Sequence, residues 1–72
     1  MTDHAMIAKL STAIDNMMDV LDHIEQYRKQ DGVYERGFWR LGEAVSHATW
    51  MRWELRGRID RERARTDTDQ QV

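Results

Sequence analysis

Residues 7–24, IAKLSTAIDNMMDVLDHI, decide the fold of this chain. Apolar side chains recur along them at alternating steps of three and four residues, a spacing that places them on one side of an α-helix. These side chains are Ile7, Leu10, Ile14, Met17, Leu21 and Ile24. The stretch therefore predicts a long amphipathic helix with an apolar seam that needs a partner.

A second stretch, residues 38–59, FWRLGEAVSHATWMRWELRGRI, repeats the same spacing. Its seam positions are Phe38, Leu41, Val45, Ala48, Leu55 and Ile59, and Arg52 stands at the one position that is not apolar. Between the two stretches, Asp31 and Gly32 predict a turn. The fold class that follows is all-α, a two-helix antiparallel hairpin over residues 1–65.

Cap residues and glycines predict where the two helices begin and end. We expect the first helix over about residues 3–29, with Asp3 as its N-cap, and a turn over residues 30–33. Gly32 is expected in the left-handed conformation that commonly ends a helix.

The second helix is expected over about residues 34–65, since no proline interrupts it, with a fray or break near Gly37. Residues 66–72 lack apolar periodicity and predict a flexible C-terminal tail.

The small size of the chain points to self-association. A chain of 72 residues without cysteine has no disulfide and no thiolate zinc site to stabilise it, and chains of this size bury only about 60% of their unfolded surface. We therefore expect a homodimer, a four-helix bundle in which the seams pack inside. Its expected core consists of Ile7, Leu10, Ile14, Met17, Leu21, Ile24, Phe38, Leu41, Val45, Leu55 and Ile59.

Three tryptophans lie on the side of the second helix that is nearly opposite its seam: Trp39, Trp50 and Trp53. Tryptophan is the residue most enriched in binding hot spots, so these side chains are candidate anchors for a protein partner. Arg36, Arg40 and Glu43 form the expected polar rim. Two interpretations stay open, because the same side of the helix could instead close the homodimer.

Arginines crowd the end of the second helix and suggest an alternative partner. Arg56, Arg61 and Arg65 could contact the phosphates of RNA or DNA. Opposite charges four residues apart, such as Glu54 with Arg58 and Arg58 with Glu62, favour instead a solvated helix whose charges pair within it.

The sequence contains no constellation typical of catalysis, metal binding or cofactor binding. It also lacks an apolar run long enough for a membrane span and a secretory signal, so we expect a cytoplasmic protein. The predicted function is that of a non-catalytic protein–protein interaction module, a homodimeric stoichiometric inhibitor or adaptor. Phage or mobile-element modulators of a host protein are the leading class, and a helical-hairpin dimer that binds RNA or DNA is the alternative.

Overall fold

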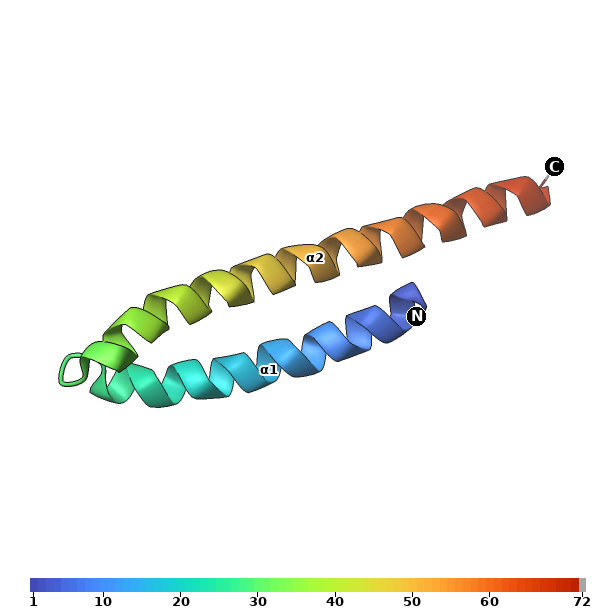
Figure 1. The fold of residues 1–72 in the computed structure, drawn as a ribbon. Coiled ribbons are helices and arrows are strands. Elements are labelled where there is room, and N and C mark those ends of the chain that lie inside the picture. The colour runs from blue at the N-terminus through green and yellow to red at the C-terminus, as the bar shows by residue number, and fades with distance from the viewer. Residues whose placement is uncertain (72) are drawn as a thin grey trace.

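The chain folds into two long helices that lie side by side (Figure 1). The computed structural model describes residues 1–71 and the side chains of residues 1–66. Helix α1 runs over Asp3–Tyr27 and helix α2 over Gly32–Gln71, and no strand occurs within residues 1–71. The helices run in opposite directions from the turn, which confirms the predicted hairpin (Figure 1). The molecule is a rod that measures 64 × 17 × 15 Å.

Helix α1 begins one residue earlier than a cap at Asp3 allows. Thr2 is the N-cap: its backbone is extended, and its Oγ1 accepts a hydrogen bond of 3.1 Å from the backbone N–H of Ala5. The prediction of Asp3 as the cap was therefore wrong. Asp3 is the first helical residue, and its carboxylate is left available for a contact with α2.

Asp31 caps the second helix and fixes the turn. Its Oδ1 accepts hydrogen bonds from the backbone N–H groups of Val33, at 2.9 Å, and Tyr34, at 3.3 Å. The turn before it is closed by a hydrogen bond of 3.0 Å from the N–H of Gln30 to the carbonyl of Tyr27. No residue within the described part of the chain has a positive φ, so the expectation of a left-handed Gly32 was wrong. Gly32 instead opens α2, because the side chain of Asp31 supplies the cap.

Helix α2 is longer than expected at both ends. It passes through Gly37 without a break and ends at Gln71, so the predicted end at residue 65 was wrong. A glycine costs about 1 kcal/mol in a helix interior, which does not stop a helix that gains one hydrogen bond per added residue and meets no proline. The segment predicted as a tail is therefore helical up to Gln71, and Val72 lies outside the described residues.

The apolar seams of the two helices pack against each other within one chain. Ile14, Ile24 and Leu55 are at most 7% exposed, and every other seam position is half-buried. The heptad pattern thus identified the inward side of both helices. Because only three side chains within residues 1–66 are buried, the hairpin has a thin core for its length.

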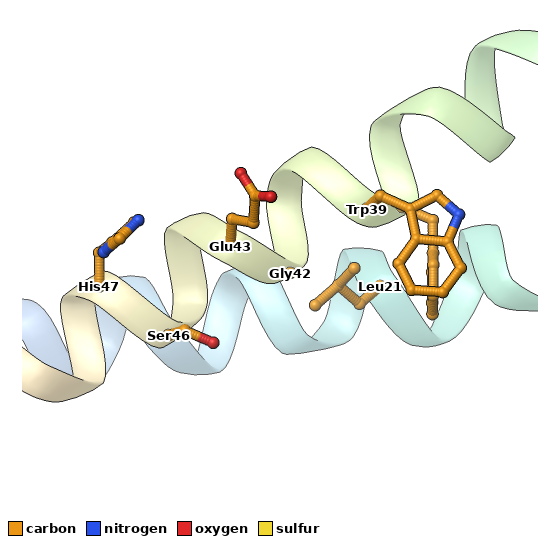
Figure 2. A pocket seen from close by; sticks show the side chains of 7 residues that line it. Leu21, Trp39, Gly42, Glu43, Ser46 and His47 are labelled. Atoms are coloured by element: carbon orange, nitrogen blue, oxygen red, sulfur yellow. The ribbon is translucent and has the colours of Figure 1, made fainter.

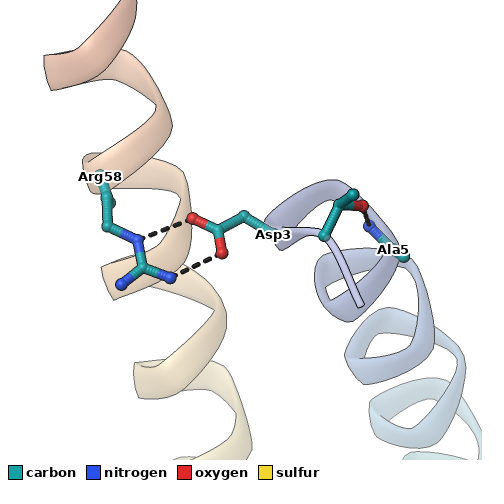
Figure 3. Close-up of polar contacts among 4 residues, drawn as sticks. Asp3, Ala5 and Arg58 are labelled. Carbon is teal, nitrogen blue, oxygen red and sulfur yellow. Dashed lines mark hydrogen bonds and ion pairs between the residues drawn. The ribbon is translucent and has the colours of Figure 1, made fainter.

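Two arginines of α2 cross to α1. Arg52, the polar residue in the seam, donates a hydrogen bond of 3.2 Å from its Nη1 to Oγ of Ser11. Arg58 holds Asp3 by two hydrogen bonds, from Nε at 2.7 Å and from Nη2 at 2.6 Å (Figure 3). The hydrogen bonds of Arg58 thus go to α1, where the sequence predicted pairing within its own helix.

This ion pair shifts the pKa of both groups. The hydrogen bonds from Arg58 lower the pKa of the Asp3 carboxyl, and Asp3 raises the pKa of the Arg58 guanidinium. The pair joins the first turn of α1 to the middle of α2, and α2 continues alone beyond it (Figure 1).

Candidate protein-interaction surface

The three tryptophans of α2 lie outside the contact between the helices. Trp39 and Trp50 are each 60% exposed and Trp53 is 67% exposed. Together they expose roughly 450 Å² of side-chain surface, given that a fully exposed tryptophan offers about 250 Å². We call the surface that carries Trp39, Trp50 and Trp53 the tryptophan face.

A hollow separates Trp39 from the other two tryptophans. It has a volume of about 650 Å³ and lies between Leu21 of α1 and the α2 residues around Gly42 (Figure 2). Its full lining is Leu21, Phe38, Trp39, Gly42, Glu43, Ser46 and His47. A Cβ atom placed on Gly42 would meet nothing within 4 Å, so the hairpin itself leaves the space above this glycine open.

A second hollow continues the first along α2. It has a volume of about 470 Å³ and is lined by Val45, Ser46, Thr49, Trp50 and Trp53. Ser46 borders both hollows. The tryptophan face is therefore a line of small residues between large indole rings, and its middle is recessed.

Trp39 is held in place by two charged residues that the sequence analysis did not single out. Its Nε1 donates a hydrogen bond of 3.1 Å to Oε1 of Glu35, one turn earlier on α2. The guanidinium of Arg28 lies 4.4 Å from the ring centre of Phe38 and 5.3 Å from that of Trp39. Nη1 of Arg28 also lies 3.6 Å from Oε2 of Glu35. The spacing of Glu35 and Trp39 by four residues could have predicted their contact, whereas nothing in the pattern placed Arg28.

The predicted rim residues divide into two groups. Glu43 lines the first hollow, beside Trp39 and Gly42. Arg36 and Arg40 are exposed on α2 and line neither hollow. The structure thus brings Glu43, but not the two arginines, to the recessed part of the tryptophan face.

The arginines predicted for nucleic acid do not gather at one place. Arg56 borders a depression of about 280 Å³ that also holds Asp60, Arg63 and His4. Arg61 borders a different depression, together with Trp50 and Met51. Arg65 is exposed near the end of the described side chains. Arg56 therefore lies apart from Arg61, whereas Arg61 and Arg65, four residues apart, lie on the same side of α2.

A second apolar surface lies on α1. Val20 is 50% exposed, Tyr27 is 46% exposed, and Ala13 is exposed on the same side of the helix. These residues are seven apart in sequence and so share one row along α1. We call this row the α1 flank.

Other classes of site gain no support from the geometry. Over the residues that the structure describes, no three histidine or acidic side chains come together as metal ligands, and neither helix has a stretch apolar and long enough to cross a bilayer. A comparison of the chain with protein-family models, curated proteins and solved structures finds no match.

Proposed function

We propose that this chain is a non-catalytic protein–protein interaction module that acts as a homodimeric inhibitor or adaptor. Modulators of host proteins encoded by phages or mobile elements are the class of protein that this proposal favours. The tryptophan face is the observation on which the proposal rests. Three tryptophans, each at least 60% exposed, lie on a helix whose seam already packs against α1.

The exposed tryptophan area is a large part of what specific binding requires. A standard interface buries about 800 Å² on each partner, so the roughly 450 Å² of the tryptophan side chains would supply more than half of it. Tryptophan also contributes disproportionately to binding energy when a partner excludes water from it.

The total surface of the chain supports an associated state. The chain exposes 5861 Å², whereas a compact monomer of 8.6 kDa exposes about 4,700 Å². Part of the excess belongs to the end of α2 beyond Arg58, and part to the tryptophan face and the α1 flank. Burial of these apolar surfaces in an assembly of four helices would bring the exposed area towards the usual value.

Substitution of one tryptophan tests the proposal. We expect wild-type protein to associate with a protein ligand, and a Trp50→Ala variant of equal helicity to lose this association by at least about tenfold. Val33→Ala is the matched control, because Val33 is 67% exposed near the start of α2 and lines neither hollow. Equal binding by wild type and Trp50→Ala, measured by calorimetry or biosensor, would contradict the proposal.

None of the contacts among the described side chains favours the alternative that the chain binds nucleic acid. Arg56 and Arg61 border different depressions, and Arg58 is engaged with Asp3. Binding through these arginines would weaken steeply as salt concentration rises, whereas binding through indole rings would not.

A further inference from the structure

We propose that the tryptophan face binds a second copy of this chain, through antiparallel pairing of the two α2 helices about a twofold axis at Ser46. This inference rests on the proposed function, since it names the partner of the same surface.

The pairing surface is a second heptad row on α2. The row consists of Glu35, Trp39, Gly42, Ser46, Thr49, Trp53 and Arg56, again at alternating steps of four and three. We call it the α2 row. Each member from Trp39 to Arg56 follows a seam residue by one position, so the row lies about 100° around the helix from the seam. In a four-helix bundle each helix packs against two neighbouring helices, which lie about 90° apart around it. The angle between the seam and the α2 row is close to this value, so α2 can pack against α1 and a second helix at the same time.

The α2 row is complementary in size to its own reversed copy. A twofold axis at Ser46 places Trp39 beside Trp53 of the second copy, because the two tryptophans lie seven residues on either side of the axis. Small side chains of the α2 row then meet in the middle, where Gly42 lies within one residue of the level of Thr49 of the second copy. Small residues allow the backbones of two helices to approach closely, while the indole rings overlap at both ends. Twofold interfaces require this kind of self-complementarity.

In this arrangement, Trp50 of the second copy fills the open space above Gly42. Trp50 lies four residues after Ser46 and Gly42 four residues before it, so Trp50 of the second copy comes to lie above Gly42. There it meets the hollow of about 650 Å³ that Leu21 and Trp39 border. The hollow is larger than one indole side chain, and the twofold axis provides the same contact twice.

The charges at the ends of the α2 row favour the antiparallel orientation. Glu35 stands before Trp39, and Arg56 stands after Trp53. Antiparallel pairing brings each Glu35 towards Arg56 of the other copy, whereas parallel pairing would bring like charges together. Glu35 can accept a further donor, since its carboxylate receives one hydrogen bond from Trp39 and has Arg28 at 3.6 Å.

Cysteine cross-linking tests the pairing directly, because the natural chain has no cysteine. Gly42→Cys and Thr49→Cys chains are mixed and oxidised, so that only cysteines within disulfide distance are joined. We expect efficient cross-linking between the two variants and little within either variant alone. Gly42 tolerates the substitution, because a Cβ there meets nothing within 4 Å. Ala44→Cys, exposed on another side of α2, is the control and should not cross-link with either.

Variants at the ends of the α2 row provide a second measurement. Trp53→Lys should weaken self-association by at least about tenfold in sedimentation, while Val33→Lys should leave it unchanged. Glu35→Arg and Arg56→Glu should each weaken it, and the two together should restore it. This recovery is expected only if residues 35 and 56 of different copies meet.

The outcomes separate this inference from the proposed function. A monomer at every accessible concentration would overturn the pairing and the homodimeric part of the proposed function, but a tryptophan-dependent complex with another protein would still support its interaction-module part. Cross-linking of Gly42→Cys with itself would overturn the antiparallel orientation. Dimers that resist Trp53→Lys but dissociate on Val20→Lys would assign the second copy to the α1 flank and overturn the inference.

Discussion

At the scale of single residues, Asp3 and Arg58 show how one ion pair joins the first turn of α1 to the middle of α2. Their side chains are 55 positions apart in sequence, and two hydrogen bonds hold them together. Arg58 is half-exposed, so water and salt weaken the attraction. The pair therefore positions the first turn of α1 on α2, and most of the hairpin's stability comes from the seam.

The lowered pKa of Asp3 predicts a specific dependence on pH. Because its pKa is lower in the folded than in the unfolded chain, the stabilisation is present above the unfolded pKa and is lost as pH falls through the folded pKa. Asp3→Asn should therefore lower the melting temperature at neutral pH. The difference from wild type should shrink between about pH 5 and pH 2.

Thermal melts followed by circular dichroism measure this effect. Asp15→Asn is the matched control, since it removes the same charge from an exposed site on α1. An Asp3→Asn variant whose deficit is the same at every pH would show that the ion pair is not its cause.

At the scale of the helices, α2 shows that a long helix can continue through glycines, although glycine has a low helix propensity. It contains several glycines in its interior and still runs from Gly32 to Gln71. The seam of α1 holds part of its length, and the absence of proline allows the rest to continue. An exposed or half-exposed glycine in such a helix is a site where stability can be gained.

Gly37→Ala is predicted to stabilise the hairpin. Its new Cβ would meet nothing within 4 Å, so the gain in helix propensity has no steric cost. We expect the free energy of unfolding to rise by about 0.5–1 kcal/mol. Chemical denaturation at a fixed low protein concentration measures this change in the free energy of unfolding.

Gly57→Ala provides the comparison for this prediction. Its Cβ would lie 3.2 Å from Nη1 of Arg61, so that side chain must move and the gain should be smaller. A loss of stability on Gly37→Ala would indicate that the residue needs a close approach by another backbone.

The sequence predicted the helices better than their ends. The heptad spacing identified the inward side of both helices, because burial follows periodicity when two long helices have only each other to contact. The caps were less predictable: Thr2 and Asp3 are both good cap residues, and only the backbone decides between them. Contacts between residues far apart in sequence, such as Arg28 on Phe38 or Arg58 on Asp3, leave no trace in local spacing.

At the scale of the whole molecule, a thin core coexists with a large exposed apolar surface. Three of the described side chains are buried, whereas Trp39, Trp50 and Trp53 each remain at least 60% exposed. The sequence predicted the seam as the inward side and the tryptophan face as a second apolar side, but left open whether that face closes a homodimer or binds another protein. The structure assigns the seam to the contact between α1 and α2, which leaves the tryptophan face exposed.

If the folded chain associates, its stability must depend on concentration. We expect the melting temperature to rise with protein concentration, because association removes folded monomer from the unfolding equilibrium. Tryptophan emission should shift to shorter wavelength over the same range as the indole rings leave water. A melting temperature and an emission maximum that are both independent of concentration would contradict self-association.

Because α2 is one continuous helix, it fixes the distance between Ser46 and the C-terminal end of the helix. With a rise of about 1.5 Å per residue, Gln71 stands about 38 Å along the helix axis from Ser46. In the antiparallel pair, two such arms point in opposite directions, so the C-terminal ends of the assembly are separated by about 75 Å. Anything fused there would be held at opposite poles, and fluorophores attached to these ends would exchange little energy even in a tight complex.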